Sequence, residues 1–466
     1  MADRNPSLSK TSSIAIIGAG TFGISTAYHL AKRGYTNIRC LDRHPVPSLD
    51  SAGYDLNKII RTEYDEPLYT NLALEALNAW RQPEWSGIFH ETLRSSLAID
   101  SSHLGQGRIV TTLGDPLAEK HLKESYENLR KAGQAGSLEL VEGKEQIAKH
   151  VPQLRNADGI EKWKGLWNSQ GGWAHAKKSL EKWGQEALDM GVKFISGPEG
   201  TMTGLNLDSS GNLDGVKVAS GDVVHADRYI LCTGAASPAV LPELSREMWT
   251  KCWSLAHIEL NDDEVVQWKG IPVVDNFELG FTFEPDPETS KSQSINMIWR
   301  VPDQFEERMK ICDGSPGYQY RVGTYTDPSG KVEHYSIPRY ASTHPDDGIP
   351  DEAANAIKRF VDTVMPQFSG RPLLGARVCW CTDSPDAHWL IDNHPKHQSL
   401  LLATGDSGHA FKMFPIIGDY ISDALEGKER GLRKEWKYGN RKSKPVATRP
   451  GTEVKDLRDV MHLKTK

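Results

Sequence analysis

Hydrophobic, glycine and polar positions alternate in a strand–helix–strand pattern at the start of the chain. Residues 14–17 form a short apolar run, residues 18–23 a glycine-rich turn, and residues 25–32 a helical pattern. A second strand pattern follows at residues 37–41. Elements in this order predict a βαβ unit, which pairs its two strands in parallel.

A similar pattern returns further along the chain. Residues 174–190 show a helical pattern, residues 192–195 a strand pattern, and the apolar segment 229–232 leads into Gly234. Between 206 and 218, short alternating stretches are separated by Asn, Asp, Ser and Gly. They predict a small β-meander inserted into the sheet domain.

The pattern changes at residues 253–340, which are richer in β-type alternation and aromatic residues. This segment predicts a different, mostly antiparallel domain. From Leu400 the glycine-rich and then helical pattern returns, so the first and last thirds are expected to build one domain with the middle of the chain.

We interpret the basic tail from Lys428 as a solvated surface extension, because its periodicity is weak. No internal repeat is present in the sequence.

The first glycine turn carries the earliest functional signal. Gly18-Ala-Gly-Thr-Phe-Gly23 matches G-x-G-x-x-G and lies between a predicted strand and a predicted helix. Gly18 permits the tight turn, Gly20 lets the backbone approach a pyrophosphate, and Gly23 lets the helix pack closely. Backbone N–H groups at the helix start then face the phosphates. A dinucleotide is therefore predicted to bind here.

Asp42 and a later segment help to choose the dinucleotide. Asp42 follows Gly23 by 19 residues and ends the second strand, where a carboxylate can accept hydrogen bonds from a ribose 2′-OH but repels the 2′-phosphate of NADP. The segment 229–235, Tyr-Ile-Leu-Cys-Thr-Gly-Ala, resembles the second flavin motif of flavoproteins with two dinucleotide folds. Flavin is favoured. An NAD-dependent dehydrogenase stays as an alternative that needs a second nucleotide site.

Composition and charge narrow the class of protein. The chain has 466 residues, enough for two domains, and 38% hydrophobic with 25% charged residues is typical of a globular protein. The net charge of −7 gives no reason to expect nucleic acid or an anionic membrane as partner. No apolar run is long enough to cross a bilayer, and the first twelve residues lack a secretory apolar region.

Six cysteines are spread through the chain, and this spacing does not indicate a disulfide framework. They are Cys40, Cys232, Cys252, Cys312, Cys379 and Cys381. We therefore expect a cytoplasmic protein. Peroxisomal residence is the alternative for a producer of peroxide, although the final residues are not a Ser-Lys-Leu signal.

Motifs in a fixed order point to a known family. The last third contains Cys379-Trp-Cys381-Thr-Asp-Ser-Pro-Asp386, Leu390-Ile-Asp392-Asn-His-Pro395 and Gly405-Asp-Ser-Gly408-His-Ala-Phe-Lys412. Supporting stretches are Ser51-Ala-Gly-Tyr-Asp-Leu-Asn-Lys58, Gly172-Trp-Ala-His-Ala176 and Lys310-Ile-Cys-Asp313. Residues 13–430 resemble the monomeric sarcosine oxidase family of FAD-dependent amine oxidases, most closely its fungal fructosyl amino acid oxidases (amadoriases).

The resemblance implies an α/β plus β fold like that of D-amino acid oxidase. A Rossmann-type FAD-binding domain is expected to comprise residues 1–90, 160–245 and 376–466. It would be interleaved with a mostly antiparallel substrate domain of residues 91–159 and 246–375.

The resemblance also implies how the cofactor and substrate are held. Cys379 matches the family cysteine that forms an 8α-S-cysteinyl bond to FAD, and Lys310 matches the lysine that activates oxygen beside the flavin ring. Lys412 and Arg61 match residues that bind the substrate carboxylate, and Lys58 matches a lysine near the flavin. The predicted cofactor-binding residues are Gly18, Gly20, Thr21, Phe22, Gly23, Asp42, Arg43, Lys58, Val192, Gly234, Cys379, Gly408 and Lys412.

The residues themselves leave other interpretations open. Without the resemblance, Cys379 and Cys381 read as small buried hydrophobic residues or as half of a metal site, and Lys310 reads as a solvated strand lysine. We expect no metal. His409 is interpreted as a support for its turn in preference to a catalytic base. The tryptophans at 163, 167 and 173 fit a substrate pocket and core packing equally well.

Two departures from the amadoriase pattern bear on the substrate. Gly314 occupies the position of the amadoriase glutamate that holds the fructosyl amine, and Gly408-His-Ala replaces Gly-Arg-Gly. We therefore predict a monomeric oxidase of a non-sugar secondary amine derived from an amino acid, yielding an imine and H₂O₂ from O₂. The imine is either hydrolysed or trapped in a ring, as in fungal secondary metabolism. A fructosyl amino acid oxidase and a saccharopine or pipecolate oxidase remain alternatives.

Overall fold

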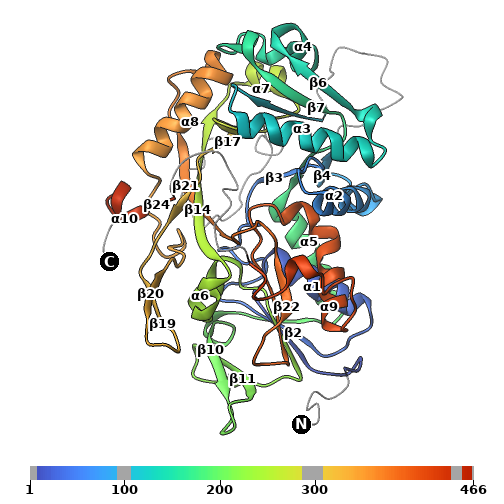
Figure 1. Ribbon diagram of the computed structural model, residues 1–466, viewed down its shortest axis with the longest axis vertical. Helices are drawn as coiled ribbons and strands as arrows, with labels where there is room; N and C mark the ends of the chain where they lie inside the picture. The colour runs from blue at the N-terminus through green and yellow to red at the C-terminus, as the bar shows by residue number, and fades with distance from the viewer. Residues whose placement is uncertain (1–7, 92–106, 286–307, 442–453, 464–466) are drawn as a thin grey trace.

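Two β-sheets organise the chain in a computed structural model that describes residues 8–91, 107–285, 308–441 and 454–463. Figure 1 shows a mostly antiparallel half above an α/β half, with the long strands β14 (Trp249–Glu259) and β21 (Leu374–Asp383) of the antiparallel sheet reaching down toward the α/β half. The predicted combination of a Rossmann-type domain with an antiparallel domain is confirmed.

The α/β half is built on a six-stranded sheet. Its order is β22 (Leu390–Asn393), β23 (Leu400–Thr404), β13 (Arg228–Leu231), β1 (Ile14–Ile17), β2 (Ile38–Leu41) and β9 (Lys193–Ile195). Neighbouring strands are parallel except β22 and β23. All four residues of β1 are buried, as expected for a parallel strand covered on both faces.

Helices from the two ends and the middle of the chain pack in the core of this half. They are α1 (Thr21–Lys32), α2 (Pro67–Trp80), α5 (Ala176–Asp189) and α9 (Phe414–Leu425). Ser25 Oγ donates to Phe414 O at 2.7 Å, and a Cβ added to Gly418 would lie 2.1 Å from the backbone of Ser25. Because α1 and α9 approach so closely, the first and last thirds of the chain share one core. The predicted meander forms β10 (Met202–Leu207), β11 (Leu213–Val218) and β12 (Val223–Val224).

The antiparallel half is a ten-stranded sheet within the described residues. In spatial order it contains β24 (Lys455–Asp456), β18 (Tyr318–Gln319), β14 (Trp249–Glu259), β17 (Arg308–Asp313), β16 (Gly280–Thr282), β15 (Val273–Asn276), β5 (Arg108–Thr112), β7 (Lys164–Asn168) and β6 (Leu138–Glu142). β21 (Leu374–Asp383) also pairs with β14. Only β15–β5 and β18–β24 pair in parallel among these described strands. The helices of this half are α3 (Pro116–Lys131), α4 (Gly143–His150), α7 (Asp262–Trp268) and α8 (Asp351–Val364).

Smaller elements complete the described fold. A three-stranded sheet of β3 (Asn57–Ile60), β8 (Gly172–His175) and β4 (Phe89–Glu91) lies beside the α/β half. β19 (Gly323–Thr326) and β20 (Val332–Tyr335) form a hairpin, and α6 (Ser237–Val240) and α10 (Leu457–Val460) are single turns.

The antiparallel sheet extends beyond the predicted domain limits at 160 and 376, because it contains β7 and β21. The domain boundaries themselves stay predictions.

The prediction for the C-terminal tail is wrong in its described part. Trp436 is buried and its ring centroid lies 5.2 Å from that of Trp389. Arg441 forms a buried ion pair with Asp386 at 3.0 Å, and β24 adds to the edge of the antiparallel sheet. The tail is therefore anchored to both halves. Its anchors are single residues far apart in the sequence, which give no periodic pattern.

Candidate active site

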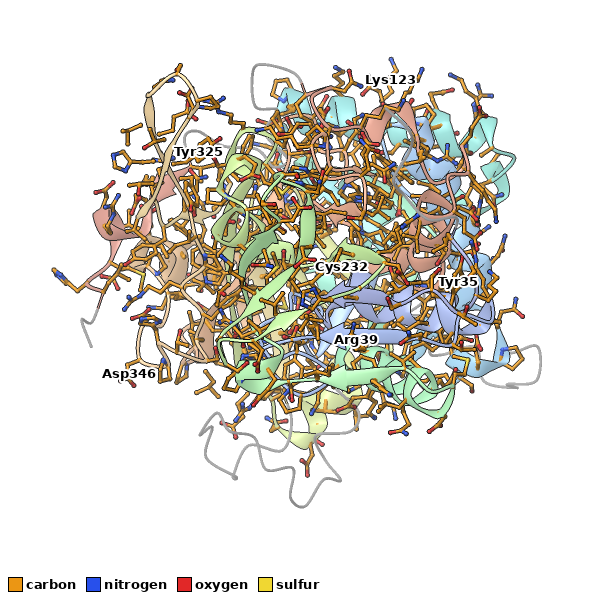
Figure 2. The ribbon with its side chains drawn as sticks, turned by 90° about the horizontal axis from the view of Figure 1, so that it is seen from below. Tyr35, Arg39, Lys123, Cys232, Tyr325 and Asp346 are labelled. Atoms are coloured by element: carbon orange, nitrogen blue, oxygen red, sulfur yellow. The ribbon has the colours of Figure 1, made fainter. Side chains whose placement is uncertain are left out.

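A cavity of ≈ 610 Å³ lies between the two halves and is lined by both. The α/β half contributes the turn after β1, the end of β2, and the segments 232–236 and 403–412. The antiparallel half contributes side chains from β14, β15, β17 and β21. In the view from below (Figure 2), Cys232, which lines this cavity, lies near the middle of the projection.

The glycine turn has the close backbone approaches that its sequence predicts. A Cβ at Gly18, where φ is +106°, would lie 2.4 Å from Cys232 O, and one at Gly23 would lie 1.7 Å from Gly18 O. Gly20 lines the cavity, and a Cβ there would lie 2.8 Å from Ser51 Oγ. Thr21 and Phe22 also line the cavity. The start of α1 therefore meets the cavity through bare backbone, which suits a phosphate group.

The end of β2 forms another part of the same wall. Asp42 accepts hydrogen bonds from Ala19 N and His44 N, both at 2.8 Å, and burial raises the pKa of its carboxyl. Arg43 lines the cavity and pairs with Asp50 at 2.9 Å. Gly234 and Gly408 also line the cavity. These residues fit one extended ligand running along the carboxyl ends of β1, β2 and β13.

Val192 does not lie at the cavity wall. It is 3% exposed and belongs to the core around α5, and its N–H donates to Ala187 O at 3.0 Å. Gly200, Thr201 and Met202 line the cavity in that region. The prediction of a direct contact from Val192 is not supported, because the chain turns after α5 and brings the next segment to the wall.

One buried carboxylate organises the cations of the site. Asp55 accepts from Lys310 Nζ at 2.5 Å and Lys58 Nζ at 2.8 Å on one oxygen, and from Arg377 at 2.9 Å on the other. Burial opposes its ionisation, but Lys310, Lys58 and Arg377 outweigh that effect and hold the pKa of Asp55 well below its usual range. Asp55 therefore stays ionised and fixes the two lysines at the cavity.

Lys310 projects from β17 toward the small sheet. It is 2% exposed, and its Nζ also donates to Asn57 O at 3.0 Å. The alternative of a solvated strand lysine is therefore wrong. The opposite charge of Asp55 helps to raise the pKa of Lys58 above its usual range despite burial, so Lys58 is a cation.

Cys379 and Cys381 lie two residues apart on β21, so they share one face of the strand, and both line the cavity. Cys379 is half-buried and lines the cavity opposite Trp253 in the β14–β21 pair. Cys381 is buried, and its thiol lies 3.5 Å from Lys251 O. All six cysteines are free thiols. Cys379 is thus placed where an electrophile bound in the cavity can reach its thiol.

Arg61 and Lys412 form a second basic region of the wall. Arg61 lies over the Tyr64 ring, with its Cζ 4.2 Å from the ring centroid, and donates to Glu63 O. Lys412 Nζ donates to His409 O at 3.1 Å, and burial holds the pKa of Lys412 well below its usual range. Neither side chain forms an ion pair with a carboxylate among the described residues. This region can accept an anionic group from a ligand.

His409 supports its turn, as predicted. Its Nε2 lies 2.9 Å from Ala387 O and its Nδ1 lies 3.3 Å from the Tyr64 hydroxyl. Because a carbonyl only accepts, Nε2 carries the hydrogen and Nδ1 accepts from Tyr64. Burial holds the pKa of His409 well below its usual range, so the ring is neutral.

The tryptophan cluster does not line the cavity. Trp163 is buried in the core of the antiparallel half, and Trp167 stacks on His150 at 4.6 Å between ring centroids. Trp173 donates to Glu284 at 2.7 Å and stacks on His90. Of the two interpretations, core packing is the one that the structure favours.

Several residues at the cavity were missed in the sequence. Asp55 lies inside the stretch 51–58 that resembles the family, and Arg108 is held by Glu63 at 3.3 Å and Asp275 at 2.5 Å. Asp406 also lines the cavity, and burial raises the pKa of its carboxyl to about 6. Apart from Lys58, three residues after Asp55, the ion-pair partners of Asp55 and Arg108 are far away in the sequence, so no local pattern signals these contacts.

The rim of the cavity carries one group of potential metal ligands. Asp65, His121 and Glu124 bring ligand atoms within 4.8 Å of one another, and two of these side chains are exposed. Exposed acidic groups are common without an ion, so the expectation of no metal stays a prediction. None of the described helices has the length and apolar character that crossing a membrane requires.

The glycine turn, the long cavity and the two interleaved sheets define a dinucleotide-dependent oxidoreductase. The family model described as DAO, FAD dependent oxidoreductase, matches residues 13–424, and the chain belongs to this family. It is an FAD-dependent oxidase of the class that acts on amines and amino acids. The bare backbone at Gly18 and Gly20 fits the FAD that the family implies.

Named relatives agree with the predicted resemblance. L-saccharopine oxidase from Schizosaccharomyces pombe is 32% identical over 434 residues, 91% of each chain. The crystal structure of a thermally stable fructosyl peptide oxidase mutant has a TM-score of 0.83 and 31% identity, covering 98% of this chain and 100% of that one. Amadoriase II from Aspergillus fumigatus has a TM-score of 0.80 and 33% identity, with 98% of each chain covered. The predicted family and fold are confirmed.

Replacing Asp55 by Asn tests the buried charge cluster. We expect the free energy of unfolding at neutral pH to fall by about 3 kcal/mol or more, because buried cations lose their counter-charge. The pKa of Asp55 is lower in the folded protein than in the unfolded chain, where it is about 3.9. Its contribution to the free energy of unfolding is therefore complete above a pH of about 3.9 and is lost as the pH falls through the pKa of the folded protein. Urea unfolding at several pH values measures this.

The matched control is Arg377→Ala, since the Arg377 side chain is 38% exposed. We expect it to cost about 1 kcal/mol or less. Equal losses from the two variants would contradict the assignment of Asp55 as the centre of the cluster.

Proposed function

We propose that this protein oxidises the secondary amine of an amino acid derivative without a sugar. The observation that carries the proposal is the pair Arg61 and Lys412, two basic side chains on the cavity wall without a carboxylate partner among the described residues, in the same cavity as Lys310. A bound substrate carboxylate would supply the counter-charge that Lys412 lacks. Arg61 offers the planar fork that suits such a group.

The chemistry follows from the cofactor and from fixed charges. Bound FAD would supply the two-electron chemistry of this reaction, in which the substrate loses a hydride from the carbon next to nitrogen and a proton from nitrogen to give an imine, and O₂ is reduced to H₂O₂. Arg61 and Lys412 would hold the carboxylate and so orient that carbon. Lys310, fixed by Asp55, provides a positive charge in a dry part of the site, where negative charge developing on oxygen is stabilised. Lys58 adds a second fixed cation.

The backbone near Gly314 argues against a sugar-binding pocket. A Cβ at Gly314 would lie 2.7 Å from Gly280 N and 2.9 Å from Leu279 C. Gly280 itself has φ of +129°, which disfavours a side chain there. The glutamate that the amadoriase resemblance implies at Gly314 therefore needs a backbone shift in this chain. The relative named L-saccharopine oxidase makes a saccharopine-like conjugate our preferred substrate.

A fructosyl amino acid is the second candidate, supported by the fold similarity to fructosyl peptide oxidases. N-methyl amino acids and cyclic imino acids such as pipecolate belong to the same reaction class. The fate of the imine, the monomeric state and the cytoplasmic location stay predictions.

Peroxide release tests the proposed function. The purified holoenzyme is offered L-saccharopine, pipecolate, an N-methyl amino acid and a fructosyl amino acid in turn. We expect O₂-dependent H₂O₂ with at least one non-sugar compound, and a rise in KM of about 10-fold or more in Lys412→Met, because a charge-assisted contact is lost. Turnover of the fructosyl compound alone would overturn the non-sugar assignment, and turnover of none would overturn the proposal.

We further propose that Cys379 carries the FAD through an 8α-S-cysteinyl bond. The half-buried thiol at the cavity wall supports this, as does its place in the motif that resembles the family. After acid precipitation, flavin colour is expected to stay with the wild-type polypeptide and to leave with the supernatant in Cys379→Ala. Cys381→Ala is the control and should retain the flavin, since its thiol faces Lys251. Free flavin from the wild type would contradict the bond.

A further inference from the structure

The connection from β20 to α8, residues 336–350, contacts the α/β half. Ser342 Oγ on this connection donates to Asp50 Oδ1 at 2.6 Å. The other oxygen of Asp50 pairs with Arg43 at 2.9 Å and with His44 Nε2 at 2.8 Å. Asp50 is therefore shared between the end of the nucleotide-binding βαβ unit and a segment almost 300 residues later in the chain.

The same segment is fixed along its length. Arg339 pairs with Asp347 through two hydrogen bonds of 2.6 Å and 3.0 Å. Trp380 Nε1, next to Cys379, donates to Arg339 O at 2.8 Å. The backbone N–H groups of Thr343 and His344 close a turn on Tyr340 O. Asp346, on the outer side of this segment, lies toward the edge of the molecule in Figure 2.

Tyr340 is the residue that this segment presents to the cavity. Its side chain is buried, it lines the cavity, and Arg43 lies over its ring at 5.0 Å. Its hydroxyl forms no hydrogen bond with a described residue. The hydroxyl oxygen is also absent from the described unpaired atoms that are fully enclosed, so part of its surface stays open. Since a buried hydroxyl is expected to find a partner, this one is available to a ligand in the cavity.

The surroundings of Tyr340 identify the part of the cavity it faces. After burial, the groups that act most on its pKa are Asp50, Arg43, Asp42 and Cys379, and the net effect is to raise that pKa. The phenol is therefore neutral and can donate a hydrogen bond. Asp42 lies at the end of the nucleotide-binding strand and Cys379 on the strand β21, so Tyr340 lies between the two walls of the cofactor cavity.

We propose that Tyr340 is a cofactor-binding residue whose hydroxyl donates to an oxygen of bound FAD, and that the Ser342–Asp50 hydrogen bond holds Tyr340 in place. Arg43 and Asp50 link this contact to the βαβ unit, so the antiparallel half takes part in retaining the cofactor. This role is independent of the substrate and of the bond to Cys379.

The test measures FAD binding directly in a Cys379→Ala background, or in the wild-type chain if its flavin is released by acid. The dissociation constant for FAD is obtained from the change in flavin fluorescence on binding. We expect Tyr340→Phe and Ser342→Ala each to raise it about 5- to 30-fold, the effect of losing one hydrogen bond to or behind the ligand. Tyr325→Phe and Ser329→Ala, on the β19–β20 hairpin, are the matched controls and should leave it unchanged.

Thermal unfolding with and without FAD separates binding from a purely structural role. A lower unfolding temperature confined to the FAD-bound form supports the proposal, because Tyr340→Phe keeps the ring beneath Arg43. An unchanged dissociation constant in Tyr340→Phe would overturn it. An equal loss of unfolding temperature in the bound and free forms, without a change in affinity, would also overturn it. Both readouts need no substrate, so they stand apart from the outcome of the peroxide assay.

Discussion

The buried carboxylate of Asp55 is the constraint on which the site depends. It joins Lys58 on β3, Lys310 on β17 and Arg377 on β21, so one side chain connects the small sheet with two strands of the antiparallel sheet. Three cations on one carboxylate leave the cluster positive. Such a charge is costly to bury without an anionic ligand, and in the reaction we propose it would stabilise negative charge that develops on oxygen. Stability of the fold and reactivity of the site therefore draw on the same contacts.

The sequence predicted elements well where a pattern is local. The strands at 14–17 and 37–41, the glycine turn between them and the helix at 174–190 lie within a few residues of β1, β2 and α5. Their hydrophobic periodicity and turn residues act over short stretches of chain. Long-range contacts were not predictable in this way. Asp55, Arg108 and the buried tail residue Trp436 acquire their roles only when distant segments meet.

In the candidate site too, some residues could be predicted from the sequence and others could not. The family resemblance brought Lys310, Lys58, Arg61, Lys412 and Cys379 together on one cavity, where the structure also places them. The sequence shows Gly314 where the amadoriase pattern has a glutamate. In the structure a Cβ at Gly314 would lie 2.7 Å from the backbone nitrogen of Gly280, which leaves no room for it. The cavity contact expected of Val192 is made in that region by residues 200–202, because Val192 itself packs in the core after α5. The contacts of Tyr340 come from an irregular connection that has no sequence signature.

The central claim is that Lys310, fixed by Asp55, serves the reaction with oxygen and not the oxidation of the amine. The most direct measurement mixes the holoenzyme with its amine substrate without oxygen, follows loss of the flavin colour, and then admits air. Wild type is predicted to be reduced by the substrate and reoxidised rapidly. Lys310→Met should still be reduced but should reoxidise about 100-fold more slowly, because a fixed charge is lost where oxygen accepts electrons. Reoxidation of Lys310→Met at the wild-type rate would contradict the account.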